Sequence, residues 1–207
     1  MSPAFITLEG IDGSGKSTQA ALLAAALEHA GASVCHLREP GGTTISENIR
    51  ALLLDPDNTK MGTTCELLLY EAARAQLVHE VIAPALAAGK TVICDRFYDS
   101  TTAYQAFAGG LDRDRVRLAN ELAVDGVHPT LTLVFDLPVE AAAHRAAGRG
   151  AADRMEAKGI AYQRRVAEGF HALAAEEPAR VRLVDASGTP SEVHARALAI
   201  VREAVSL

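Results

Sequence analysis

The stretch EGIDGSGKST, residues 9–18, decides the fold of this chain. Residues 10–17 satisfy the pattern G-x-x-x-x-G-K-[ST], which is typical of a phosphate-binding loop. The apolar run AFITLE precedes the loop, and the run STQAALLAAALEHAG, rich in helix-forming residues, begins within it. A strand before the loop and a helix after it are the context that this pattern requires, so a chance glycine-rich turn is a poor alternative. We predict a nucleotide site at the first strand–helix junction.

Each residue type in the loop has a physical use. Glycines let the backbone turn its N–H groups toward an anion, and the following helix directs the positive end of its dipole to the same point. Lys16 is expected to reach the β- and γ-phosphates, and the Ser17 hydroxyl to ligate Mg²⁺. The predicted nucleotide-binding residues are Gly10, Ile11, Asp12, Gly13, Ser14, Gly15, Lys16, Ser17 and Thr18.

Composition excludes several classes of protein. The chain has 207 residues and a net charge of −6, so it lacks the broad positive field of a nucleic-acid-binding protein. Its three scattered cysteines, Cys35, Cys65 and Cys94, form no C-x-x-C pair and are expected to be reduced thiols. No signal peptide and no apolar run of membrane-spanning length is visible. These features predict a cytoplasmic protein that binds neither nucleic acid nor membrane.

Strand-like and helix-like runs alternate along the chain, which predicts an α/β fold with a mainly parallel sheet covered on both faces. The expected strands are residues 4–9, 32–39, 90–95, 129–136 and 179–186. The expected helices include residues 17–31, 44–55, 65–89 with a kink at Pro84, and 190–205. We predict one domain over residues 1–207. The run RAAGRGAADRMEAKG looks like an inserted lid, placed at about residues 146–158.

The strand KTVICD ends in Asp95 and is followed by Arg96. Ligands of open α/β sheets bind at this edge, so Asp95 is a candidate for holding Mg²⁺, directly or through water, and Arg96 for gripping a phosphate. A simple Asp–Arg surface pair is the alternative. Asp136 also ends a strand, but no cation is adjacent, and a structural role is favoured. The absence of N-K-x-D argues against a GTPase, and the short chain argues against an ATPase motor.

Four blocks, FITLEGIDGSGKSTQ, REPGGT, LLLYEAARAQ and DRFYDSTTAYQ, together resemble bacterial thymidylate kinases, and the match covers nearly the whole chain in the right order. The resemblance implies phosphorylation of dTMP by ATP with Mg²⁺. It implies a nucleoside-monophosphate-kinase fold with a five-stranded parallel sheet flanked by helices and a short lid. It also implies a homodimer and assigns the phosphate loop to ATP.

The resemblance further assigns dTMP-binding residues. Arg38 and Arg50 would face the phosphate of dTMP. Tyr70 and Arg74 lie four apart on one helical face and would stack on the pyrimidine and donate to its oxygen. The family usually has phenylalanine where this chain has Tyr70. The remaining assigned positions are Arg96, Ser100 and Thr101 near the base, Tyr104 against the sugar 2′ position, Gln105 on thymine and Asp12 near the sugar 3′-hydroxyl and the metal.

Two departures from the family concern arginines. Many members carry an arginine where this chain has Gly109, and some carry one in the phosphate loop, where this chain has Gly13. Lid arginines would then supply the missing charge: Arg145 against adenine, with Arg149 and Arg154 closing over the transferring phosphate. The catalytic candidates are Lys16, Arg96, Arg149 and Arg154. Backbone groups of residues 187–189 are expected to line the adenine.

The implied mechanism is in-line transfer to an already anionic phosphate oxygen, which needs positioning and charge stabilisation rather than a strong general base. Two alternatives remain open from the sequence. One is another nucleotide or nucleoside kinase that acts on thymidine or UMP. The other is a nucleotide-dependent switch module, for which the paired Tyr70 and Arg74 would have no evident use.

Overall fold

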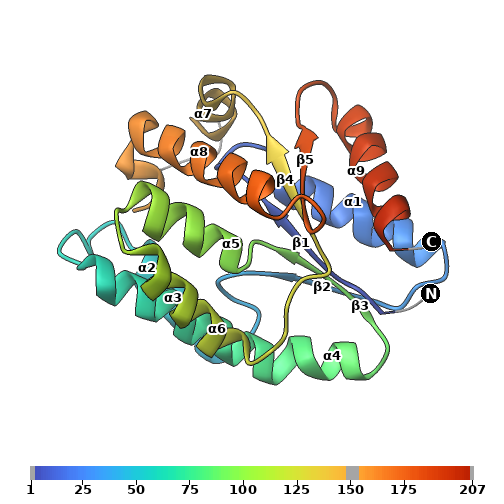
Figure 1. Cartoon of the computed structure of the whole chain (residues 1–207), viewed down its shortest axis with the longest axis horizontal. Helices are drawn as coiled ribbons and strands as arrows, with labels where there is room; N and C mark the ends of the chain where they lie inside the picture. The colour runs from blue at the N-terminus through green and yellow to red at the C-terminus, as the bar shows by residue number, and fades with distance from the viewer. Residues whose placement is uncertain (1–2, 148–153, 206–207) are drawn as a thin grey trace.

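The computed structural model describes residues 3–147 and 154–205. Its centre is a sheet of five parallel strands in the order β2-β3-β1-β4-β5 (Figure 1). The predicted α/β fold with a five-stranded parallel sheet is therefore confirmed. The strands are shorter than predicted by a residue or more: β1 (Phe5–Glu9), β2 (Val34–Arg38), β3 (Thr91–Asp95), β4 (Leu131–Asp136) and β5 (Val181–Asp185).

The burial of each strand follows from its place in the sheet. Every residue of the central strand β1 is buried, and so is every residue of β4 except Asp136. Both strands read as nearly continuous apolar runs, as expected where helices cover both faces. The outer strands β2 and β5 expose part of their side chains.

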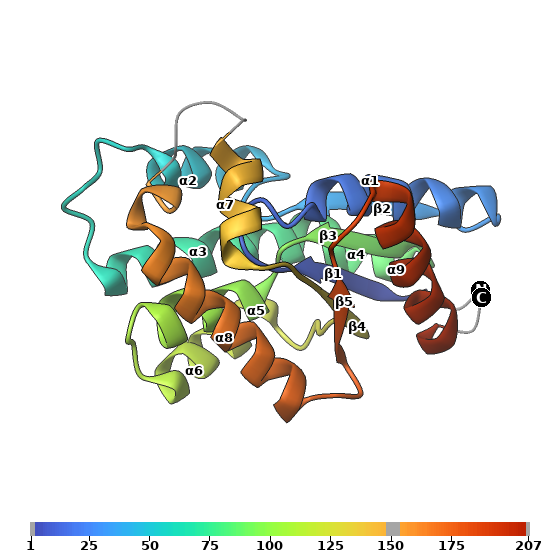
Figure 2. The ribbon, with the colours of Figure 1, turned by 90° about the horizontal axis from the view of Figure 1, so that it is seen from above.

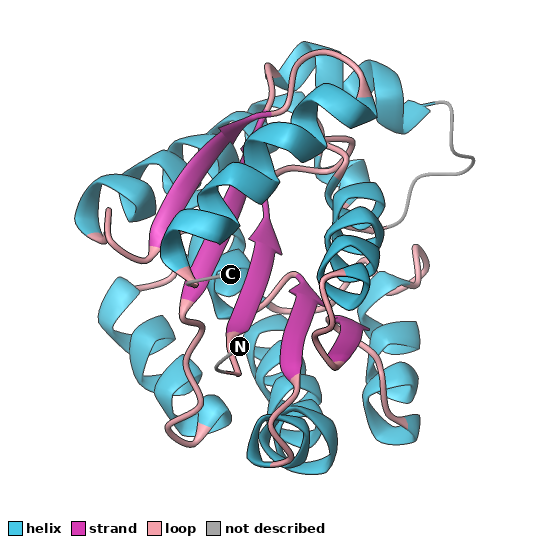
Figure 3. Cartoon of the chain, turned by 90° about the vertical axis from the view of Figure 1, so that its right-hand side faces the viewer, coloured by secondary structure: helices cyan, strands magenta, loops and turns pink. Residues whose placement is uncertain are grey.

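Helices cover both faces of the sheet (Figures 2 and 3). One face carries α1 (Lys16–His29) and α9 (Pro190–Ala204), which also pack against each other. The other carries α4 (Ala83–Ala87) and α8 (Ile160–Glu176), while α6 (Arg113–Val124) packs mainly against α3 (Thr63–Leu77). Leu23 and Leu27 of α1 and Phe170 of α8 are fully buried in the largest core cluster.

The carboxyl ends of the strands form the edge that holds the site. From β1 the chain crosses to β2 on one side of the sheet, returns through β3 and later continues to β4 on the other side. This reversal leaves a crevice at the carboxyl ends, where ligands bind in such folds. Around it lie α2 (Thr44–Leu54), α3 (Thr63–Leu77), α5 (Tyr98–Thr101) and α7 (Val139–Ala147) (Figure 2).

Two helical segments differ from the sequence prediction. The run predicted as one helix with a kink at Pro84 contains α3, a π-helical segment (Val78–Ile82) and α4. Proline cannot donate to the carbonyl four residues earlier, so the wide turn lies just before it. The residues after Arg96, which were not among the expected helices, form α5 and a second π-helical segment (Thr102–Ala108).

The predicted lid at residues 146–158 lies partly outside the described residues. Its described parts are the end of α7 and a 3₁₀ turn (Glu156–Lys158). All three cysteines are free, in line with the prediction of reduced thiols. Within residues 3–147 and 154–205, no helix is both long enough and apolar enough to cross a bilayer.

Candidate active site

The phosphate loop follows β1 directly, and two of its glycines are required by close packing. Gly10 has φ +135°, and a Cβ there would lie 2.7 Å from the carbonyl oxygen of Phe135 on β4. Gly13 has φ +87°, and a Cβ there would lie 2.0 Å from the carbonyl oxygen of Ala142 on α7. The backbone of α7 therefore packs directly on the loop. No side chain fits at position 13 unless α7 moves.

Lys16 is the cation of the loop. Its side chain is buried, and Nζ donates to the carbonyl oxygen of Ile11 at 2.9 Å. Burial and the nearby charge of Arg96 together lower the pKa of Lys16 to about 8, against the opposing effect of Asp12. An ammonium group has three donors, so two remain for phosphate oxygens.

The hydroxyl of Ser17 and the carboxylate of Asp95 meet beside Lys16. Ser17 Oγ donates to Asp95 Oδ2 at 2.5 Å, while the buried Asp95 Oδ1 has no hydrogen-bond partner. A hydroxyl beside an orphaned carboxylate oxygen suits a Mg²⁺ ion, which typically takes few protein ligands and completes its shell with phosphate oxygens and water. In the part of the chain that the structure describes, no group of three or more His, Cys, Asp or Glu residues is placed to hold a metal. The donor set therefore fits a metal bound together with a nucleotide.

We call the groove around these residues the phosphate cleft. Loop residues, residues at the carboxyl ends of β2 and β3, and one residue each from α2 and the 3₁₀ turn line it. They are Asp12, Gly13, Gly15, Lys16, Ser17, Thr18, Arg38, Glu39, Arg50, Asp95, Arg96 and Glu156.

Arg96 lies at the centre of the site in a left-handed backbone conformation, with φ +72°. Nη1 donates to the carbonyl oxygen of Gly10 and to Ser100 Oγ, both at 3.1 Å. Nη2 forms an ion pair with Asp12 at 2.5 Å. Burial alone would raise the pKa of Asp12, but the charges of Arg96 and Lys16 lower it below its ordinary value. Asp12 and Arg96 thus stay ionised against each other.

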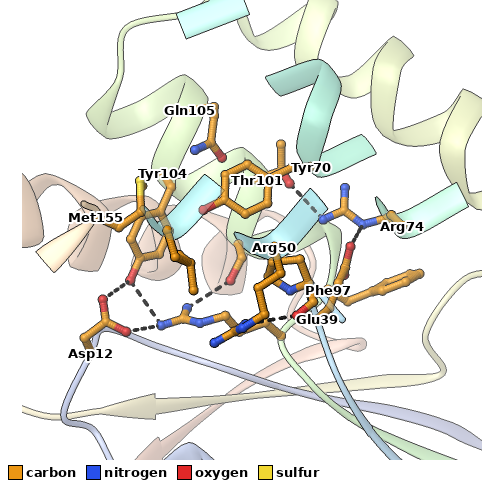
Figure 4. A pocket seen from close by; sticks show the side chains of 14 residues that line it. Asp12, Glu39, Arg50, Tyr70, Arg74, Phe97, Thr101, Tyr104, Gln105 and Met155 are labelled. Carbon is orange, nitrogen blue, oxygen red and sulfur yellow. Dashed lines mark hydrogen bonds and ion pairs between the residues drawn. The ribbon is translucent and has the colours of Figure 1, made fainter. Parts of the chain in front are cut away.

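A second pocket opens beside the phosphate cleft, and we call it the acceptor pocket (Figure 4). Side chains from α2, α3, α5 and the second π-helical segment line it. The lining residues are Asp12, Glu39, Pro40, Arg50, Leu54, Tyr70, Arg74, Arg96, Phe97, Ser100, Thr101, Tyr104, Gln105 and Met155. This list contains every predicted dTMP-binding residue except Arg38, which lines the phosphate cleft instead. Asp12, Arg50 and Arg96 line both, so the two cavities adjoin.

Arg74 is held in the acceptor pocket by several ion pairs and hydrogen bonds. Its side chain is almost fully buried, with ion pairs to Glu39 at 2.8 Å and to Glu71 at 2.7 Å. It also donates to Asn120 and to the hydroxyl of Thr101, the latter at 2.9 Å. Burial raises the pKa of Glu39 above its ordinary value, and the guanidinium of Arg74 opposes the shift and favours the ionised carboxylate. We predicted Arg74 as a base contact but missed the two carboxylates and the amide that fix it.

Two further side chains of the pocket are held by polar contacts. The Tyr104 hydroxyl donates to Asp12 and accepts from Arg96, both at 3.3 Å. The Gln105 amide nitrogen donates to Glu66 at 2.8 Å. The hydroxyl of Tyr70 points toward the interior of the pocket (Figure 4). At Gly109, a Cβ would lie 2.6 Å from the carbonyl oxygen of Gln105, so no side chain, arginine included, fits at this position unless the backbone shifts.

The two arginines predicted to face the acceptor phosphate are anchored by neighbouring groups. Arg38 Nη2 forms an ion pair with Glu47 at 3.0 Å, and both side chains are about half exposed. Arg50 Nη1 donates to the carbonyl oxygen of Pro40 at 2.9 Å. A bound phosphate could compete with Glu47 for Arg38, because that pair is solvated and weak.

The lid arginines lie at different places. Arg154 donates from Nε to the carbonyl oxygen of Leu53 at 2.7 Å and forms an ion pair with Glu66 at 2.5 Å, joined there by Lys158. It lines neither the phosphate cleft nor the acceptor pocket. A role over the transferring phosphate would require Arg154 to leave Glu66, so that role stays a prediction. Arg149 lies outside the described residues.

The residues predicted to line adenine lie together. Arg145 at the end of α7 donates to the carbonyl oxygen of Ala186 at 3.4 Å, next to residues 187–189. The carbonyl of Ser187 accepts from Arg196 at 2.7 Å. The two segments predicted to line adenine are thus neighbours in space. Asp136, for which we favoured a structural role, pairs with His171 at 3.0 Å.

Comparison with known proteins agrees with this geometry. The family model of thymidylate kinase matches residues 8–197. The chain belongs to the thymidylate kinase family. The thymidylate kinase of Trichlorobacter lovleyi is 49% identical over 195 residues, covering 91% of this chain and 92% of the relative. That of Synechococcus sp. strain JA-2-3B'a(2-13) is 49% identical over 203 residues, covering 98% and 96%.

A solved structure supports the same conclusion. The crystal structure of thymidylate kinase from Ehrlichia chaffeensis superimposes with a TM-score of 0.81 at 32% identity, covering 97% of this chain and 100% of that one. The resemblance drawn from four sequence blocks is therefore confirmed. As a member of this family the protein is a nucleoside monophosphate kinase.

Proposed function

We propose that this protein transfers the γ-phosphoryl group of ATP to dTMP, giving dTDP for dTTP synthesis. The observation that carries the proposal is the junction of the two cavities. A loop built for nucleotide phosphates opens through Asp12, Arg50 and Arg96 into a pocket with an aromatic ring and a buried guanidinium. A nucleoside monophosphate in that pocket would present its phosphate to the loop.

The recognition of thymine follows from the chemistry of the pocket. The ring of Tyr70 offers a stacking face, and Arg74, Thr101 and Gln105 offer polar groups along one side. Arg74 carries a donor, and it is fixed by Thr101 and two carboxylates before any ligand binds. Preorganised donors of this kind discriminate between bases because a wrong base leaves a buried polar group unpaired.

Catalysis would rest on positioning and on charge. The phosphate of dTMP is already anionic, so no strong general base is needed. Lys16 would bind the β- and γ-phosphates, while Arg96, Arg38 and Arg50 would hold the acceptor phosphate in line. Ser17 and Asp95 would hold Mg²⁺, which supplies neutralising charge between the β- and γ-phosphates.

The lid would supply the remaining positive charge. A catalytic arginine contributes about 10³–10⁵ in rate, or roughly 4–7 kcal/mol of barrier. Arg149 and Arg154 are our candidates, within a lid at about residues 146–158 of a single domain over residues 1–207. Arg145 and backbone groups of residues 187–189 would line the adenine. Closure of the lid would keep water away from ATP.

A homodimer is also part of the proposal. Three adjacent helices expose large apolar side chains: α3 packs against both α2 and α6. The exposed side chains are Ile45, Leu52, Leu68, Leu118 and Leu122. Contiguous apolar surface of this kind favours burial against a partner. We place the enzyme in the cytoplasm, where ATP is available.

An acceptor panel tests the function. Purified protein with Mg²⁺ and ATP is offered dTMP, dUMP, UMP, CMP, AMP and thymidine, and ADP release is measured. We expect dTMP to give the highest kcat/KM. Preference for thymidine would indicate a nucleoside kinase, and equal turnover with AMP or CMP would refute the proposal. Slow hydrolysis unaffected by every acceptor would indicate a switch module.

A further inference from the structure

Glu9 is the last residue of β1 and precedes the phosphate loop. Its side chain is fully buried, with 0% of its surface exposed, so it cannot touch a bound nucleotide. An ionised or protonated carboxyl group in such a position needs hydrogen-bond partners to offset the cost of its burial. Its partners all belong to the segment that follows β3.

The carboxylate of Glu9 caps the start of α5 from the neighbouring strand. Oε1 accepts from the backbone N–H of Phe97 at 2.7 Å and of Ser100 at 3.1 Å. Oε2 accepts from the hydroxyl of Ser100 at 2.5 Å. Phe97, the N-cap of α5, makes no side-chain capping bond of its own. The carboxylate of Glu9 thus takes the place of a side-chain N-cap for α5.

These bonds fix the turn that carries Arg96. A non-glycine residue with φ +72° is strained, and such strain persists only where the surroundings over-determine it. Arg96 lies directly before Phe97 and four residues before Ser100, the two residues whose N–H groups Glu9 binds. Ser100 also accepts from Arg96 Nη1 at 3.1 Å, so a single hydroxyl links the carboxylate of Glu9 to the guanidinium.

We infer that Glu9 is a positioning residue for phosphoryl transfer, which sets the place and direction of the Arg96 guanidinium through the α5 turn and the hydroxyl of Ser100. The inference rests on the proposed role of Arg96 in holding the acceptor phosphate. Glu9 would act from behind the site, without contact with substrate.

The charges around Glu9 make its effect depend on pH. Burial, helped by the charge of Asp99 and opposed by that of Arg96, raises the pKa of Glu9 to about 7. The other titratable groups that interact with it are Lys16, Glu39 and Cys94. Below about pH 7 the carboxyl group gains a proton. It then donates toward Ser100 and no longer supplies a negative charge behind Arg96.

The test compares wild type with Glu9→Gln. Glutamine keeps the size and the acceptor for the two N–H groups, but it turns an amide donor toward Ser100. We expect kcat/KM for dTMP to fall about 10- to 100-fold, as for one lost hydrogen bond to a charged group, with unchanged ATP affinity. We also expect the decline in log kcat/KM as pH falls through 7 to be shallower in the variant, because the contribution of Glu9 is missing. Ionisation of the dTMP phosphate contributes equally to both profiles.

Each outcome decides the matter. If the wild-type protein does not phosphorylate dTMP, the proposed function is refuted, and this inference fails with it. If the wild-type protein is active and Glu9→Gln has the same kcat/KM and the same pH profile, the role of Glu9 is refuted while the proposed function stands. If Glu9→Gln does not fold, as judged by its melting curve, Ser100→Ala replaces it, since that change cuts the link and leaves both backbone bonds. An unchanged pH profile in Ser100→Ala then overturns the inference, and a shallower acid limb supports it.

Discussion

Replacing Arg74 with methionine should lower the free energy of unfolding as well as weaken binding in the acceptor pocket. The change removes the one guanidinium that pairs with both Glu39 and Glu71, and it leaves two carboxylates buried side by side. Breaking a buried pair by removing one partner costs about 3–5 kcal/mol. For a chain of this size each kcal/mol lowers Tm by roughly 2–4 °C, so we expect a fall of about 6–20 °C.

Urea titration of ligand-free protein, followed by circular dichroism, measures this loss. Arg164→Met is the matched control, because Arg164 pairs with Glu140 at 2.6 Å while both side chains are more than half exposed. Such a pair contributes about 0–1 kcal/mol. Adding Glu39→Gln and Glu71→Gln to Arg74→Met should restore much of the stability, since the uncompensated charges are then gone. If Arg74→Met loses no more stability than the control, the reasoning about buried charge is wrong.

Three further predictions concern the reaction. Because the pKa of Lys16 lies at about 8, its ammonium group loses its proton above that pH, and the ATP Kd should rise up to tenfold per pH unit beyond 8. Calorimetry in two buffers should show proton uptake on ATP binding at pH 8.5. A Kd that stays constant from pH 7 to 9 would argue against this role of Lys16. Arg154→Ala combined with Arg149→Ala should lower kcat by about 10³ or more with little change in the dTMP Kd. Steady-state kinetics measures kcat, and titration with dTMP measures the Kd. A rise in KM alone would exclude charge stabilisation by the lid. Tyr104→Phe removes two hydrogen bonds of 3.3 Å and should reduce kcat/KM for dTMP by up to about tenfold, and a larger loss would mean that the hydroxyl touches substrate.

The parts of the fold that the sequence predicts well are those encoded locally. Five apolar runs alternating with helical runs predict the parallel sheet, and the loop pattern fixes the place of Lys16 and Ser17. The spacing of Tyr70 and Arg74 puts them on one helical face, and both line the acceptor pocket. The π-helical segments were missed because their side-chain pattern is too close to that of an α-helix to be distinguished in a short run.

The supporting carboxylates could not be predicted, because their partners are far away in the chain. Glu9 binds residues 88 and 91 positions later. Glu66 binds Gln105 at a separation of 39 and Arg154 at a separation of 88. Neither has a local pattern: both look like ordinary charged residues at the end of a strand and in the first turn of a helix. Only the folded arrangement shows that their charges are buried and paired.

The contact between Gly13 and α7 limits how this enzyme could be redesigned. An arginine grafted into the loop at position 13 would force its Cβ against the carbonyl of Ala142. Such a graft would displace α7, whose last turn carries Arg145, the residue that we propose to contact adenine. Charge gained at the β- and γ-phosphates would therefore be accompanied by a misplaced adenine contact. The loop arginine and the present helix position are mutually exclusive, so an exchange between the two designs requires the loop and the helix to change together.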